Sequence, residues 1–199
     1  MACGTRTRHL GRFGRKLNAR QVPLVEGCVV TSFPSFADSR GEWRRVAESS
    51  RFPRLSASDE QTIRQVSISV NKKLGTVRGL HYLDISQNEY KNVTCFSGRI
   101  FDVVVDLREE SSTYGKFMAL ELTSDGQSTS IIIPPGCAHG FQTLEDNSTI
   151  AYSMTVNYSS EYDRGINPLD SELGIEWPLA ISDMSPRDSE LPRFFEEFE

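Results

Sequence analysis

The chain has 199 residues, 38% of them hydrophobic and 10% aromatic, and a formal net charge of -5. That length suits one domain with a substantial core and is too short for two of ordinary size. No apolar run approaches the roughly 20 residues that a membrane span needs. The acidic balance gives no general attraction for nucleic acid, although a few arginines in one cleft would still suit a small anionic ligand. We therefore expect a soluble, cytoplasmic protein without a membrane or nucleic-acid partner.

The cysteines and histidines give no sign of a metal site. The four cysteines, which form no CxxC pair and no regular spacing, are Cys3, Cys28, Cys95 and Cys137. Neither a zinc site nor a disulfide framework is indicated by this pattern, and a reducing compartment fits it best. His139 has no histidine two residues away that would complete a metal site with it. We expect neither metal nor cofactor.

The first 20 residues differ in composition from the rest of the chain. They hold six of the 22 basic side chains and none of the 27 acidic ones. An arginine-rich start is typical of a transit peptide, but this one lacks serine, and a start codon chosen too early is another explanation. We interpret residues 1–20 as a basic, disordered arm and residues 21–199 as a single domain.

The pattern between residues 20 and 160 predicts short strands. Apolar and β-branched runs alternate there with turns rich in Gly, Asp, Asn and Pro. We expect strands over residues 24–32, 63–70, 92–96, 99–107, 117–122, 130–133 and 149–156, and a strand or short helix over 42–50. No run keeps helical periodicity over three turns, so an antiparallel sandwich or barrel is predicted. Residues 169–173 and 191–199 are expected to add short helices.

Two of these strands predict which side chains face the core. In residues 99–107, four apolar side chains share one face and Asp102 lies on the opposite face. Asp102 is therefore either a solvated strand residue or the partner of a histidine on a neighbouring strand. In residues 63–70, the apolar side chains Val66, Ile68 and Val70 alternate with polar ones, which predicts a half-buried strand.

Two glycine-flanked segments carry the candidate chemistry. The first, GTVRGLHY at 75–82, contains Arg78 and His81, and the second, PPGCAHGF at 134–141, contains His139. Imidazole transfers protons readily near neutral pH, so two histidines brought together would suit acid-base catalysis. Taken alone, each histidine has an equally good interpretation as a packed, hydrogen-bonded residue.

Five segments in a fixed order carry a family resemblance. They are DSRG at 38–41, GTVRGLHY at 75–82, FDVVVDLR at 101–108, IPPGCAHGF at 133–141 and LGIEWP at 173–178. Together they resemble the dTDP-4-dehydrorhamnose 3,5-epimerase family over residues 33–188. The resemblance implies an all-β, antiparallel jelly-roll (cupin) barrel with short peripheral helices. It also implies a nucleotide-sugar substrate and a homodimer formed by exchange of N-terminal strands.

The resemblance implies roles for three residues around the proton that is removed. His81 matches the general base that takes the protons alpha to the sugar ketone. Asp188, in MSPRD at 184–188, matches the aspartate that orients this base. Lys91, ten residues after the base, matches a lysine that contacts the ketone oxygen.

Three further residues match the rest of the family's catalytic set. Tyr152, thirteen residues after His139, matches a tyrosine that acts as the acid on the opposite face of the ring. His139 itself matches a histidine that pairs with the aspartate corresponding to Asp102. Inversion needs such a second acid, since one histidine cannot reach both faces of the ring.

Five residues are candidates for substrate binding by the same resemblance. Arg78 and Arg40 match arginines that meet the diphosphate and the sugar, a task suited to the guanidinium fork. Tyr158 matches an aromatic near the nucleotide, and Arg187 stands where the family has a lysine. Gln65 opens QVSIS in place of the family's Gln-x-Asn-x-Ser, with the register shifted by about one residue.

Other departures lie near the expected pocket entrance. Arg45 stands where the family has a glutamate five residues after the arginine matched by Arg40, and the pair Glu42-Trp43 replaces two hydrophobic residues. These departures leave open which nucleotide base and sugar the protein binds and how many carbons it inverts.

From these residues we predict an isomerase that inverts carbons 3 and 5 of dTDP-4-dehydro-6-deoxyglucose to give dTDP-4-dehydrorhamnose. The alternatives are a 3-epimerase, a 3,4-ketoisomerase on a related nucleotide sugar, and a non-catalytic sugar-nucleotide binding cupin. The presence of His81, Asp188, Lys91 and Tyr152 together argues against the last, because binding alone needs no base with an orienting carboxylate.

Overall fold

The structure is a computed structural model that describes residues 25–33, 35–52, 62–125 and 129–194. The predicted basic arm, residues 1–20, lies outside the described residues. In the described part, no helix is long and apolar enough to cross a membrane.

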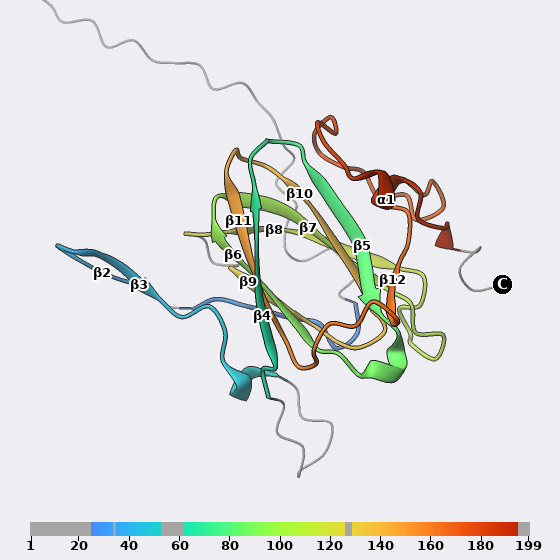
Figure 1. Cartoon of the computed structure of the whole chain (residues 1–199), viewed down its shortest axis with the longest axis horizontal. Helices are drawn as coiled ribbons and strands as arrows, with labels where there is room; N and C mark the ends of the chain where they lie inside the picture. The colour runs from blue at the N-terminus through green and yellow to red at the C-terminus, as the bar shows by residue number, and fades with distance from the viewer. Residues whose placement is uncertain (1–24, 34, 53–61, 126–128, 195–199) are drawn as a thin grey trace, which may run out of the picture.

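Two five-stranded antiparallel sheets pack against each other (Figure 1). In spatial order the first consists of β1 (Val29–Thr31), β9 (Ser130–Ile133), β6 (Lys91–Ser97), β11 (Ser148–Met154) and β4 (Gln65–Asn71). The second consists of β12 (Asp163–Gly165), β5 (Val77–Leu83), β10 (Cys137–Thr143), β7 (Arg99–Asp106) and β8 (Phe117–Thr123). Successive strands from β4 to β7 alternate between the sheets, which is jelly-roll connectivity. The predicted all-β antiparallel class is confirmed.

The strand β7, which lies between β10 and β8, is buried on both faces. Ile100 and Val104 point into the core between the sheets, whereas Phe101 and Val103 pack outward against C-terminal residues such as Leu173. Asp102 shares the inner face and is fully buried, so the solvated alternative for this residue is wrong. The C-terminal segment covers what would otherwise be an exposed apolar sheet face.

The edge strand β4 faces the opposite way from the prediction. Its apolar side chains Val66, Ile68 and Val70 are each about 60% exposed, while the polar side chains between them point toward the second sheet. The predicted alternation is therefore confirmed, but the prediction that the apolar face is the buried one is wrong. The reason is that the interior at this edge is a polar cavity, described below, and not an apolar core.

A β-bulge interrupts the pairing of β5 with β10. His139 lies opposite His81, whereas Phe141 lies opposite Arg78, so β5 has one extra residue between these pairs. A bulge of this kind changes the direction of the side chains on its strand. As a result Arg78 and His81, three residues apart, both reach the same cavity, which a regular strand would not allow.

Smaller elements surround the barrel. The hairpin β2 (Ser35–Asp38) and β3 (Gly41–Arg44) projects far from the two sheets (Figure 1). Residues 42–50 thus form the end of a strand and the beginning of the 3-10 helix η1 (Ser49–Arg51), and η2 covers Ile85–Gln87. The helix expected over 169–173 is wrong, because these residues form turns. The described α-helix is α1 (Pro186–Ser189), and the last five residues of the tail predicted over 191–199 lie outside the described part.

Candidate active site

His81 and Asp188 form a hydrogen-bonded pair between β5 and α1. The Nε2 atom of His81 lies 3.0 Å from Oδ1 of Asp188, and Oδ2 of the same carboxylate accepts the backbone N–H of Gly79 at 3.1 Å. Ser185 caps α1 by accepting the Asp188 N–H at 3.0 Å, which fixes the aspartate at the start of the helix. A backbone hydrogen bond from the Val77 N–H to the Asp183 carbonyl, 2.9 Å long, holds this segment beside the beginning of β5.

The electrostatics of this pair favour an ionised carboxylate. Burial raises the pKa of Asp188, but the hydrogen bonds from His81 and Gly79 outweigh burial and hold that pKa below its usual value. Since an ionised carboxylate only accepts hydrogen bonds, Nε2 of His81 carries the proton. Nδ1 is then the nitrogen with a free lone pair, as a general base requires.

A second pair, His139 and Asp102, lies deeper in the barrel. Nε2 of His139 is 2.7 Å from Oδ2 of Asp102, and both side chains are buried. The other carboxylate oxygen, Oδ1, has no hydrogen-bond partner among the described residues. Burial raises the pKa of Asp102, and the adjacent His139 opposes this rise. The ring of His139 meets Tyr152 edge to face, with centroids 6.2 Å apart.

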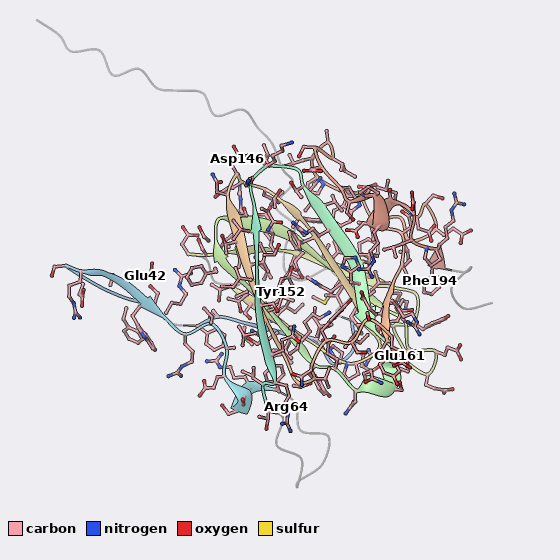
Figure 2. All side chains as sticks on the ribbon, in the orientation of Figure 1. Glu42, Arg64, Asp146, Tyr152, Glu161 and Phe194 are labelled. Carbon is pink, nitrogen blue, oxygen red and sulfur yellow. The ribbon has the colours of Figure 1, made fainter. Side chains whose placement is uncertain are left out.

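Two adjoining cavities, of about 270 and 230 Å³, open between the sheets around these pairs. Both are lined by His81, Lys91 and Tyr152. The larger also touches Gln65, Ser67, Tyr82, Leu83, Glu89, Met154, Tyr158, Asp163 and Arg187, and the smaller touches Ser69, Arg78, His139 and Phe141. Tyr152 lies near the centre of the molecule in Figure 2. Burial raises the pKa of its phenol, and the Asp102 carboxylate adds to this effect, so Tyr152 keeps its proton at neutral pH.

His81 and Tyr152 come from different sheets. His81 belongs to β5 of the second sheet, whereas Tyr152 belongs to β11 of the first. A flat ligand in the shared part of the cavities would therefore meet an imidazole on one face and a hydroxyl on the other.

The outer end of the larger cavity is organised by Asp163. Its Oδ2 atom accepts a hydrogen bond from the Tyr158 hydroxyl at 3.0 Å and pairs with the Arg187 guanidinium at 2.7 Å. The backbone N–H of Tyr158 donates to Oε1 of Gln65 at 2.8 Å. Two of the predicted binding residues, Tyr158 and Arg187, are thus connected through one carboxylate that the sequence analysis did not predict, and Gln65 joins them through the Tyr158 backbone.

Of the two predicted arginines, Arg78 lies beside a cavity and Arg40 lies away from both. The Nε atom of Arg78 donates to Oδ1 of Asn71 at 2.7 Å, so the arginine stays beside the smaller cavity with a neutral partner. Arg40 lies at the turn of the β2–β3 hairpin, pairs with Asp38 and has a side chain that is 88% exposed. Unlike the other predicted site residues, it neither lines one of the two cavities nor bonds to a residue that does.

A family model described as dTDP-4-dehydrorhamnose 3,5-epimerase matches residues 23–196. The chain belongs to this family. A curated dTDP-4-dehydrorhamnose 3,5-epimerase from Mycobacterium tuberculosis is 38% identical over 160 residues, which cover 79% of this chain and 78% of the relative.

Solved structures agree with this assignment. NovW, a 4-keto-6-deoxy sugar epimerase from the novobiocin biosynthetic gene cluster of Streptomyces spheroides, superimposes with a TM-score of 0.79. It is 33% identical, and the match covers 94% of each chain. ChmJ, a 3'-monoepimerase from Streptomyces bikiniensis in complex with dTDP-quinovose, gives a TM-score of 0.78 at 29% identity. That match covers 89% of this chain and 90% of ChmJ.

Two acidic side chains at these cavities were not predicted from the sequence. Glu89 lines the larger cavity beside Lys91, and Asp163 bridges Tyr158 and Arg187. The spacing of Glu89, two residues before Lys91, was a usable signal, because alternate residues of an extended chain share a face. Asp163 had no such signal. Among the described residues, no group of three His, Cys, Asp or Glu side chains could hold a metal ion.

Proposed function

We propose that this protein inverts carbons 3 and 5 of dTDP-4-dehydro-6-deoxyglucose to give dTDP-4-dehydrorhamnose. The observation that supports this most strongly is the pairing of a carboxylate-oriented imidazole on one sheet with a protonated phenol on the facing sheet, across a shared cavity. An epimerase needs a base and an acid on opposite faces of the ring, and His81 and Tyr152 have that relationship.

The first half of each inversion is removal of a proton. Nδ1 of His81 takes the proton from the carbon next to the ketone, and the electron pair of that C–H bond moves to make an enolate on the ketone oxygen. Asp188 stabilises the imidazolium that results. Lys91, with help from His139, stabilises the negative charge on the oxygen, since an ammonium is a compact charge suited to one oxygen.

The second half returns a proton from the other side. The Tyr152 hydroxyl donates to the same carbon on the opposite face, the carbon–oxygen double bond re-forms, and the configuration is inverted. His81 then releases its proton to solvent and Tyr152 regains one. Repeating the cycle at the carbon on the other side of the ketone accounts for the double epimerisation without a cofactor.

The binding roles follow from charge and position. Arg78 and Arg187 are suited to the sugar and the diphosphate, because guanidinium groups form paired hydrogen bonds with anionic oxygens. Tyr158 is 57% exposed, with its backbone N–H bonded to Gln65 and its hydroxyl bonded to Asp163, and its ring offers a flat surface to the nucleobase.

We propose further that the active form is a homodimer in which Arg40 enters the cavity of the partner subunit. Two surfaces support this: the projecting β2–β3 hairpin with exposed Phe36 and Trp43, and the apolar face of the edge strand β4. Exposed apolar stripes on a sheet edge are typical of association surfaces.

We also propose that the enzyme functions in the cytoplasm. The described cysteines, Cys28, Cys95 and Cys137, are free thiols. Free thiols are usual in reducing compartments, which supports this assignment.

A 3-epimerase is the second candidate, because Arg45 and the Glu42-Trp43 pair depart from the family pattern near the entrance and the similar ChmJ is named a 3'-monoepimerase. Incubation with dTDP-4-dehydro-6-deoxyglucose in deuterium oxide, followed by NMR, separates the candidates. Deuterium at carbons 3 and 5 is the expected result, and deuterium at carbon 3 alone identifies the 3-epimerase. A ketone that moves to carbon 3 identifies a ketoisomerase. An unlabelled substrate rejects epimerisation of this sugar.

A further inference from the structure

Lys91 has one ion-pair partner among the described residues, and it is an acid inside the cavity. Its Nζ atom lies 3.3 Å from Oε2 of Glu89, and the two side chains are only 17% and 11% exposed. Glu89 lies two residues before Lys91, which begins β6, so both side chains leave an extended backbone on the same face. Both line the larger cavity together with His81 and Tyr152.

The residue between them anchors this pair to the barrel. Tyr90 points to the opposite face, where it is 6% exposed and packs edge to face on Phe52. Its N–H donates to Oγ1 of Thr155 at 2.9 Å, and its carbonyl accepts the Thr155 N–H at 3.0 Å. Glu89 is therefore carried by a fixed stretch of backbone.

We propose that Glu89 is the positioning residue for Lys91, a role that rests on the proposed function of Lys91 as the contact to the ketone oxygen. A lysine side chain has four rotatable bonds, and a single ion pair restricts the position of its ammonium group. The ammonium carries three N–H donors, so one donated to Glu89 leaves two for the oxygen on which charge develops. The carboxylate thus fixes the direction of the ammonium and leaves it free to act.

A double-mutant cycle tests the proposal. E89Q keeps the size of the side chain and removes its charge, and K91M removes the ammonium. We expect E89Q to lower kcat by about 10-fold with little change in KM, because small displacements of a catalytic group are costly. On the K91M background, E89Q should change kcat by less than about 2-fold, since interacting residues are not additive.

The matched control is E121Q, which removes an exposed acid that pairs with Arg99 on the outside of β8, and its kcat should equal that of the wild type. Unchanged or increased kcat in E89Q would overturn the proposal. Equal losses on both backgrounds would also overturn it, because they would assign Glu89 a role that does not pass through Lys91.

A second measurement does not depend on activity. Trace labelling of lysines with acetic anhydride, read by mass spectrometry, should label Lys91 several-fold faster in E89Q than in the wild type. Lys116, whose ammonium lies 3.4 Å from the Ser112 carbonyl, is the internal reference and should not change. If the wild-type enzyme is inactive on this substrate but Lys91 is still labelled faster in E89Q, the proposed reaction is rejected and the positioning of Lys91 by Glu89 stands. Unchanged labelling would reject the positioning role itself.

Discussion

His81 and Asp188 are 107 positions apart in the chain and share a 3.0 Å hydrogen bond. The aspartate lies in a four-residue helix whose preceding segment runs beside the start of β5, so the contact depends on docking of the C-terminal segment on the barrel. Both oxygens of Asp188 are engaged, one by His81 and the other by Gly79.

Replacing this carboxylate should affect catalysis more than folding. We expect D188N to lower kcat by about 10²-fold or more, because the amide no longer stabilises the imidazolium and favours the wrong tautomer of His81. S185A is the matched control, since it removes only the helix cap and should cost about 1 kcal/mol of stability. Steady-state kinetics and thermal melting of the two variants separate the effects. Equal kcat in D188N and wild type would contradict the role of Asp188 in orienting His81 and stabilising the imidazolium.

Y152F should separate proton removal from inversion. His81 can still remove a proton and return deuterium to the same face, so solvent exchange into the substrate should persist. The inverted sugar should form at least about 10²-fold more slowly, because the second acid is missing. NMR in deuterium oxide measures both rates in one sample. Loss of exchange together with inversion would show that Tyr152 takes part in the first step.

Asp106 should make stability depend on pH. Burial raises the pKa of this carboxyl, but hydrogen bonds from Arg108, Ser111 and Thr113 outweigh burial and lower it from 3.8 to about 2. The folded pKa is the lower one, so the stabilisation is fully present above about pH 4 and is lost as pH falls toward 2. The Asp106 carboxylate should in this way add about 2 kcal/mol to the free energy of unfolding at neutral pH.

Urea unfolding of D106N and wild type at pH 7 and pH 3 measures this contribution. The difference in unfolding free energy should be largest at pH 7 and smaller at pH 3. E109Q, which changes an exposed acid in the following loop, should follow the wild type at both values. A difference that is the same at both pH values would mean that the carboxylate contributes through shape alone.

Mixed dimers test the position of Arg40. H81N and R40A should each be nearly inactive, but a heterodimer combines the intact His81 of one subunit with the Arg40 of the other. Random mixing should restore about one quarter of the wild-type sites, as counting of subunit combinations requires. Activity measured after co-refolding of the two variants gives the result. No recovery, with dimers present by light scattering, would assign Arg40 to its own chain or to neither site.

The close approach of β5 and β10 should be intolerant of added volume. A Cβ atom on Gly140 would lie 2.7 Å from the Arg78 carbonyl oxygen and 2.8 Å from a Leu80 methyl carbon. G140A must therefore push the strands apart beside His81 and His139, and we expect a loss of about 1–3 kcal/mol, typical of overpacking. Denaturant unfolding measures the loss. G115A provides the contrast, because its Cβ meets only the Phe194 ring at 3.6 Å, although its positive φ also disfavours alanine.

Much of the fold was predictable because strand alternation is a local property. The strand over Ser130–Ile133 matches the prediction. The two faces of β7 were also separated correctly, although the predicted apolar row packs outward against C-terminal residues and not into the core between the sheets. The orientation of β4 was not predictable from its pattern, since the same alternation fits a strand with either face inward. What decided it was the polar cavity, which exists only once β4, β5, β10 and β11 have come together.

The site was predictable only as far as motifs extend. Family spacing predicted His81, Asp188, Lys91 and Tyr152. In the structure His81, Lys91 and Tyr152 line both cavities, and Asp188 bonds to His81. Asp163 was missed because its importance comes from partners contributed by two other segments, Tyr158 and Arg187. Arg40 shows the opposite limit, since its motif was clear while its side chain lies exposed on the hairpin, away from both cavities.

The separation of His81 and Tyr152 on facing sheets means that the reaction geometry is set by the thickness of the core beneath them. Ile150 and Phe141 are fully buried in that core, and Phe141 also lines the smaller cavity. Shortening either one should leave a void between the sheets and cost about 2–5 kcal/mol of stability, so hydrocarbon packing as well as polar residues should influence how firmly the two sheets hold His81 and Tyr152.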